Sequence, residues 1–156
     1  QDMPPNRKQG PQIRSHRPHI PSIEAVYKGR RFRSLLETRF VAQLDQREIA
    51  WQYEPERIGS ARYLVDFYLP DYKCWVEVKG RFDGRESLAL PLVAIALKRE
   101  RGERLFLYLE KERYLVRPRD YQALTDEEFW AALVTPPDDG DDPLAKHVRR
   151  RPFPRP

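Results

Sequence analysis

Apolar side chains in the N-terminal half recur with the period of a helix. In the segment RFRSLLETRFVAQLDQRE they fall on one face, which predicts an amphipathic helix. These positions are Leu36, Phe40, Val41 and Leu44. Ser34 is followed three residues later by Glu37, which is the capping-box pattern of a helix N-terminus. We therefore expect a helix that starts at Ser34.

Three runs with the composition of strands follow this helix. IAWQYEPERI is stopped by Pro55, and Pro70–Lys73 separates RYLVDFYLP from KCWVEVKG. β-branched and aromatic residues bounded by turn formers are typical of strands. A four-residue hairpin loop at Pro70–Lys73 would place Asp66 directly opposite Glu77. The same register pairs Leu69 with Cys74.

Alternation along the two strands sorts their side chains into faces. One face holds Asp66 with Leu64 and Tyr68 on the first strand, and Glu77 and Lys79 with Trp75 on the second. The other face of the first strand holds Tyr63, Val65, Phe67 and Leu69. Three charged groups therefore converge on one surface. Two carboxylates repel each other there unless a cation or a lysine neutralises them.

The rest of the sequence predicts two helices and two strands. SLALPLVAIALKRER is apolar nearly all round and precedes Gly102, which indicates a buried helix with a glycine stop, and Pro91 suggests that regular helix begins near it. RLFLYLE is expected to be a strand, and YLVRP a short edge strand. TDEEFWAAL has the capping-box pair Thr125 and Glu128 of a last helix. This order predicts an α/β fold with a central mixed sheet of about four or five strands flanked by helices.

Proline and charge divide the chain into one domain and two tails. Residues 1–22 hold five and residues 135–156 six of the 15 prolines, so residues 23–134 are the predicted domain. We expect the first tail to be disordered and basic, and the second to be proline-rich and charged. The formal net charge is +5, and most of the excess lies in the tails. Such arms either bind phosphate nonspecifically or increase solubility, and the sequence leaves both open.

Composition excludes several kinds of site. One cysteine, Cys74, and three scattered histidines build neither a disulfide framework nor a zinc site of cysteine and histidine. No apolar run is long enough to span a membrane, and the N-terminus lacks the apolar run of a signal peptide. We expect no membrane association and a cytoplasmic location in a bacterial or phage-infected host cell. Any chemistry must use carboxylates, lysine or hydroxyl groups.

The candidate chemistry lies in Glu37, Asp66, Glu77 and Lys79. A magnesium ion typically takes one or two protein carboxylates together with water and substrate phosphate, and Asp66 and Glu77 supply that pair. Lys79 lies on the same face, where it can orient the attacking water, help to deprotonate it, or neutralise charge on the attacked phosphate. Hydrolysis of a phosphodiester fits these roles.

The segment VDFYLPDYKCWVEVKG resembles the PD-(D/E)xK nuclease motif. Together with RFRSLLETRF and WQYEPE, it is similar to the bacteriophage endonuclease I family, which resolves four-way DNA junctions. It resembles equally the endonuclease subunit of heteromeric transposases, which cuts at transposon ends. About a third of the chain carries this resemblance, and the order of the charged residues is more specific than E-x-K alone. The resemblance implies a restriction-endonuclease-like core.

Carried over by position, the resemblance implies metal ligands in Asp66, Glu77 and the Val78 carbonyl. It implies a further metal or water contact from Glu37, and Lys79 as the water-activating or charge-stabilising lysine. The metal implied is Mg²⁺, for which Mn²⁺ substitutes. One departure is that Val65 stands where the family often has proline, and little is lost because proline offers no ligand.

Each candidate also has a structural interpretation. Glu37 can serve only as a helix cap, and we expect capping and catalysis to require different rotamers. Asp66 in a strand needs a buried partner if it is structural. Basic residues at the ends of elements, which are either solvated or in contact with DNA phosphates, are Arg31, Arg33, Arg81, Lys98 and Arg99. The aromatic residues Trp51, Tyr53 and Trp75 fit the core better than base stacking.

The sequence thus predicts a Mg²⁺-dependent DNA endonuclease that is structure-selective and junction-resolving. Two cuts at one junction need two active sites, so we expect a homodimer acting on branched DNA. Two alternatives stay open. One is an end-cleaving nuclease subunit with a transposase partner, and the other is a noncatalytic nucleic-acid-binding or scaffold protein that has kept the fold.

Overall fold

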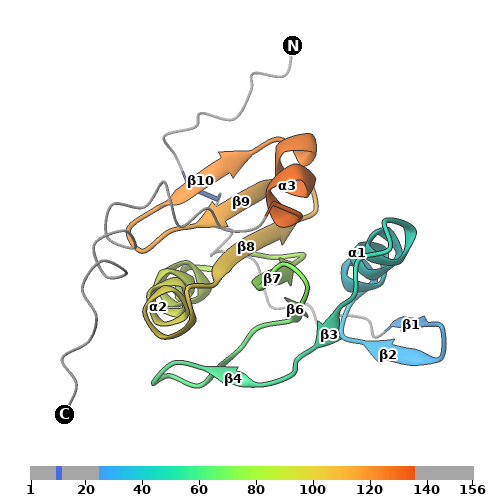
Figure 1. Cartoon of the computed structure of the whole chain (residues 1–156), viewed down its shortest axis with the longest axis horizontal. Coiled ribbons are helices and arrows are strands. Elements are labelled where there is room, and N and C mark those ends of the chain that lie inside the picture. The colour runs from blue at the N-terminus through green and yellow to red at the C-terminus, as the bar shows by residue number, and fades with distance from the viewer. Residues whose placement is uncertain (1–9, 12–24, 136–156) are drawn as a thin grey trace.

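A six-stranded mixed sheet forms the centre of the molecule in this computed structural model, which describes residues 10–11 and 25–135 (Figure 1). Its order is β10-β9-β8-β7-β6-β3. The strands are β3 (Gln52–Tyr53), β6 (Phe67–Leu69), β7 (Cys74–Lys79), β8 (Arg104–Leu109), β9 (Arg113–Val116) and β10 (Tyr121–Leu124). The predicted α/β class is confirmed, with six central strands instead of four or five. Both predicted tails lie almost wholly outside the described residues.

Three helices and two small hairpins complete the described fold. The helices are α1 (Leu35–Gln46), α2 (Gly84–Arg101) and α3 (Asp126–Leu133). The hairpins pair β1 (Ala25–Tyr27) with β2 (Arg30–Phe32), and β4 (Arg57–Ile58) with β5 (Tyr63–Leu64). Among the described residues, no helix combines the length and the apolar character needed to cross a membrane.

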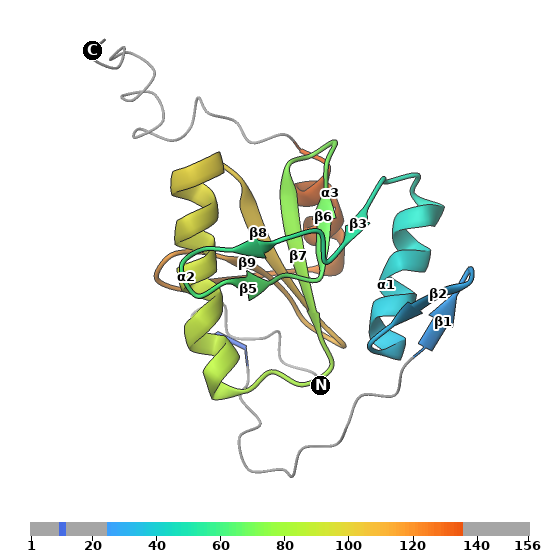
Figure 2. The ribbon, with the colours of Figure 1, turned by 90° about the horizontal axis from the view of Figure 1, so that it is seen from below.

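The helices lie on both faces of the sheet (Figure 2). Phe40 of α1 and Phe129 of α3 belong to one buried cluster with Val76 of β7. Leu90 of α2 belongs to a second buried cluster with Trp75. Alternate side chains of β7 therefore point to opposite cores, as the period of a strand requires. Trp75 is 1% exposed, so its assignment to the core is confirmed.

Helix α2 explains the one parallel pairing in the central sheet. β7 and β8 run parallel, and a parallel pair needs a crossover connection, which α2 supplies. The other neighbours in this sheet are antiparallel. Because α2 follows β7 directly in this crossover, Lys79, the last residue of β7, lies only a few residues before the start of α2.

The predicted helix signals are present in the structure. Ser34 and Glu37 form a capping box at α1, and Thr125 and Glu128 form one at α3. Gly102 ends α2 in the left-handed conformation, at φ 65°. Glycine adopts this conformation with little strain because it has no Cβ.

Substitution of Gly102 by alanine should destabilise the protein. We expect Gly102→Ala to lower the free energy of unfolding by about 1 kcal/mol, because a Cβ is strained at positive φ. Urea denaturation measures the change. Gly84→Ala, at the other end of the same helix, is the control, because a Cβ there meets open space and alanine favours helix. Equal losses in the two variants would contradict this explanation.

The predicted start of the second helix is wrong. Helix α2 begins with an Asp83–Glu86 capping box, and Pro91 lies inside it. A proline at this point leaves the carbonyl of Ser87 without its helical donor. The Tyr121 hydroxyl donates to that carbonyl at 2.8 Å, so a distant strand supplies the missing hydrogen bond.

Helix α2 is also less buried than its composition indicates. Leu90 and Leu97 are fully buried, whereas Leu88 is 75% and Leu92 63% exposed. One face of α2 therefore packs on the sheet, and the prediction of a helix buried all round is wrong.

Two strand predictions also need correction. RYLVDFYLP is broken at Val65 and Asp66 into β5 and β6. Val65 packs in the cluster of α2, whereas Phe67 packs in that of α1, so they do not share a face as expected. YLVRP overlaps β9, which is not an edge strand because β10 lies beyond it. The short strands β1, β2, β4 and β10 were not predicted, because two to four residues show no clear period.

Candidate active site

The β6–β7 hairpin brings Asp66 and Glu77 together. Its register pairs Leu69 with Cys74 and Phe67 with Val76, as the four-residue loop predicts. Asp66 lies one residue before β6, and its N–H donates to Glu77 Oε1 at 3.1 Å. The two carboxylates are buried, with exposures of 6% and 1%.

The Asp66 carboxylate is fixed by the neighbouring strand. Val78 N–H donates to Asp66 Oδ2 at 2.7 Å. The N–H and C=O of one strand residue face the same edge. The Val78 carbonyl therefore faces the same edge of β7 as the Val78 N–H, which is the edge where Asp66 lies. Val78 and Asp66 both lie just beyond Phe67 and Val76, the first residue pair between β6 and β7. The structure thus groups the three metal-ligating positions that the resemblance implies.

Glu37 reaches this site from the first turn of α1 while it caps the helix. Its Oε2 accepts N–H donors from Arg33 at 2.7 Å and Ser34 at 3.2 Å, and the Tyr53 hydroxyl at 3.1 Å. In this same rotamer, burial and then the negative charge of Asp66 raise the Glu37 pKa to about 7. The capping rotamer of Glu37 therefore already lies beside Asp66, and the expectation that catalysis requires a different rotamer stays a prediction.

Burial acts on the pKa values of the other two carboxyls as well. The pKa of Asp66 is raised well above its usual value, first by burial and then by the charge of Glu77. Burial also raises the pKa of Glu77, while Lys79 and the hydrogen bonds from Asp66 and Tyr63 oppose that rise. Three buried carboxyls thus share a site in which their negative charges are costly.

Lys79 is the cation of this site. Its Nζ lies 2.9 Å from Glu86 Oε1, on the first turn of α2. Burial alone would lower the Lys79 pKa, but the charges of Glu77 and Glu86, with Asp66 adding to them, raise it above its usual value. Lys79 therefore stays charged at neutral pH, which suits charge stabilisation better than removal of a proton from water.

The residues present fit a divalent cation that completes its shell with water and phosphate. Within the residues that the structure describes, no three His, Cys, Asp or Glu side chains are placed so that they enclose a metal on their own. Magnesium needs only one or two carboxylates and a few other oxygens. Asp66 and Glu77 with the Val78 carbonyl would hold it, and each carboxylate oxygen has a second lone pair beyond its present hydrogen bond.

The basic candidates lie at different distances from the carboxylates. Arg33 is close, because its N–H donates to Glu37 and its guanidinium pairs with Glu54 at 3.0 Å. Arg31 is in β2, and Arg81 lies two residues after Lys79. Lys98 and Arg99 lie in the last turn of α2, about 18 Å along the helix axis from Glu86. The structure does not bring these last two residues to the site.

Three residues of the site were not predicted. The Tyr63 hydroxyl donates to Glu77 Oε2, and the Tyr53 hydroxyl donates to Glu37, so each tyrosine orients one carboxylate. Glu86 holds Lys79. Of the three, only Glu86 had a signal in the sequence, because Asp83 and Glu86 have capping-box spacing. The tyrosines resemble ordinary strand residues.

Comparisons of this chain with protein-family models, with curated proteins and with solved structures found no match.

Proposed function

We propose that this protein is a Mg²⁺-dependent DNA endonuclease with a restriction-endonuclease-like core. The observation that carries the proposal is the convergence of Glu37, Asp66, Glu77 and Lys79, from α1 and the β6–β7 hairpin, on one buried site. Burying several carboxyls beside a single lysine is costly in a purely structural role. A cation that is bound during function offsets that cost.

The side chains have separable roles in this proposal. Asp66 and Glu77 hold the metal, which when bound polarises the phosphodiester and increases the acidity of water. Lys79 stabilises the negative charge that develops on the attacked phosphate. Glu37 adds a third carboxylate to the site. Tyr53 and Tyr63 keep the carboxylates in place by hydrogen bonds, as residues that contact metal ligands commonly do.

We further propose that the substrate is branched DNA and that the enzyme acts as a homodimer. The resemblance to the endonuclease I family supports a junction substrate. Resolution of a junction needs two symmetric cuts, and a twofold dimer supplies two sites. The alternative of an end-cleaving transposase subunit uses the same site with a different partner.

Cleavage of an end-labelled four-way junction beside a matched linear duplex tests both parts of the proposal. We expect cuts in the junction with Mg²⁺ or Mn²⁺, no cuts with chelator, and little cleavage of the duplex. Asp66→Ala serves as the inactive control.

Each other outcome rejects a different part of the proposal. Equal cleavage of both DNAs would keep the nuclease and reject the junction selectivity. Cleavage that persists in Asp66→Ala would reject this site. No cleavage of either DNA by the wild-type protein would favour a partner-dependent subunit or a noncatalytic binding protein.

A further inference from the structure

The β1–β2 hairpin concentrates positive charge beside the site. Between Ala25 and Ser34 the chain has no acidic residue. Its basic residues are Lys28, Arg30, Arg31 and Arg33. The hairpin lies next to α1, away from β8–β10 of the central sheet (Figure 1).

The turn of this hairpin places a lysine in a strained conformation. Lys28 has φ 49° and Gly29 has φ 78°, so both central residues of the two-residue turn are left-handed. Asparagine followed by glycine is the favoured pair in such turns. A lysine here has more backbone strain than a glycine, because its Cβ crowds the backbone at positive φ. Departures from local preference of this kind point to a use for the side chain.

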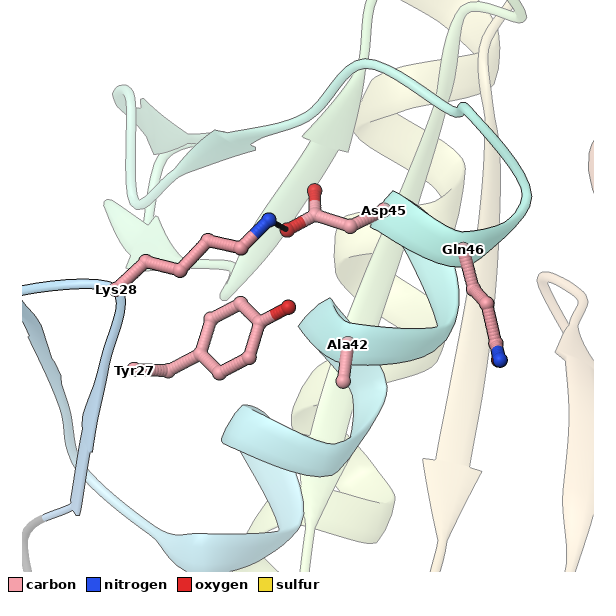
Figure 3. Close-up of a pocket in the computed structure, with 5 residues that line it drawn as sticks. All are labelled: Tyr27, Lys28, Ala42, Asp45 and Gln46. Atoms are coloured by element: carbon pink, nitrogen blue, oxygen red, sulfur yellow. Dashed lines mark hydrogen bonds and ion pairs between the residues drawn. The ribbon is translucent and has the colours of Figure 1, made fainter.

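Contacts with α1 hold the hairpin in place. Lys28 reaches across to Asp45 at 3.2 Å, and the Tyr27 ring lies between the hairpin and the helix, near Ala42 (Figure 3). Phe32, at the other end of the hairpin, is 1% exposed. A hairpin that is fixed in this way loses little conformational entropy when it binds a partner.

Arg30 connects the hairpin to the candidate active site. Its guanidinium lies 5.3 Å from the ring centroid of Trp51 and 5.6 Å from that of Tyr53. The Tyr53 hydroxyl donates to Glu37, so one aromatic ring separates Arg30 from the carboxylates. Within the described part of the chain, no carboxylate pairs with the exposed Arg30 side chain. A guanidinium that lies over a ring keeps its N–H donors for an anion.

We propose that the β1–β2 hairpin binds the phosphate backbone of the DNA substrate, with Arg30 and Lys28 each contacting a phosphate near the scissile bond. This inference rests on the proposed function, which makes DNA the substrate. Arg30 is positioned by Trp51 and Tyr53, and no carboxylate of the described residues pairs with it. Lys28 exchanges its ion pair with Asp45 for a phosphate, an exchange that costs little because the exposed lysine is well solvated and such pairs contribute little to stability.

The double variant Lys28→Asn with Arg30→Gln tests this proposal. Asparagine tolerates the left-handed turn, so the fold should be kept. Fluorescence anisotropy in chelator, with a labelled duplex and a labelled four-way junction over a salt series, measures the affinity without cleavage. We expect Kd to rise at least about tenfold, and the slope of log affinity against log salt to fall in magnitude by about 1.8, since each phosphate contact contributes about 0.9.

Arg117→Gln is the matched control. Arg117 is an exposed arginine paired with Asp120 between β9 and β10, and its loss should leave both affinity and slope unchanged. With Mg²⁺, the double variant should raise KM for the junction and leave kcat nearly unchanged, as the loss of uniform binding does. Wild-type affinity and salt slope in the double variant would overturn this inference, while cleavage by the wild-type protein would keep the proposed function. A wild-type protein that binds neither DNA would overturn both.

Discussion

The Asp66→Asn protein should unfold less readily than the wild-type protein in chelator, and it should cleave DNA at least about a hundredfold more slowly. We expect its free energy of unfolding to rise by on the order of 1 kcal/mol. Urea denaturation in chelator and cleavage of a labelled junction with Mg²⁺ measure the two effects.

The gain in stability follows from the contacts of Asp66. Its Oδ2 accepts the Val78 N–H at 2.7 Å, and the side-chain oxygen of asparagine can accept the same bond. The substitution removes a negative charge that is buried beside Glu77 and Glu37. The asparagine side chain also has N–H donors, whereas the Asp66 carboxylate has only acceptor oxygens.

Metal and pH give this prediction two further signatures. Millimolar Mg²⁺ or Mn²⁺ should stabilise the wild-type protein through binding to the folded state and should have little effect on Asp66→Asn. A carboxyl whose pKa is raised by folding stabilises the fold at low pH and loses that contribution as pH rises through the folded value. The difference between the two proteins should therefore be small below the usual Asp pKa of 3.8 and grow as pH increases.

Two results would contradict the argument. A variant that is less stable than the wild-type protein in chelator would mean that the carboxyls do not destabilise each other. A variant that gains as much stability from Mg²⁺ as the wild-type protein would mean that Asp66 is not a ligand.

Local patterns were enough to predict the centre of this site. A four-residue loop and the alternation of side chains fix how a hairpin pairs, so the meeting of Asp66 with Glu77 follows from the sequence. The helix caps follow for the same reason, because Ser34 and Glu37 are neighbours on one turn. In each case the interacting groups are close along the chain.

The errors arise where residues distant in sequence decide the outcome. Pro91 lies inside α2 because Tyr121 satisfies the carbonyl that the proline leaves unpaired. Tyr63 orients Glu77 from a hairpin whose strands are two residues long. A period cannot be recognised in so short a strand, and a tyrosine that contacts a carboxylate has the same local signature as one that packs in a core.

Replacement of Lys79 by methionine should remove cleavage activity, as Asp66→Asn does. It should destabilise the protein, whereas Asp66→Asn stabilises it. Methionine has a similar length and no charge, so Glu77 and Asp66 lose the cation that opposes their repulsion, and Glu86 loses its ion-pair partner. We expect cleavage to fall by about a hundredfold or more and the free energy of unfolding to fall by roughly 1 to 2 kcal/mol. Lys111→Met, which removes an exposed lysine between β8 and β9, should change neither quantity.

The double variant Asp66→Asn with Lys79→Met separates this electrostatic account from a loss of packing. If Lys79 stabilises the fold by neutralising buried carboxylates, its removal should cost less when Asp66 is already neutral. The two stability changes are then non-additive, with a coupling of at least about 0.5 kcal/mol between groups in one network. Additive changes, measured by urea denaturation in chelator, would mean that Lys79 does not neutralise Asp66 and that its contribution to stability comes from Glu77, Glu86 and packing.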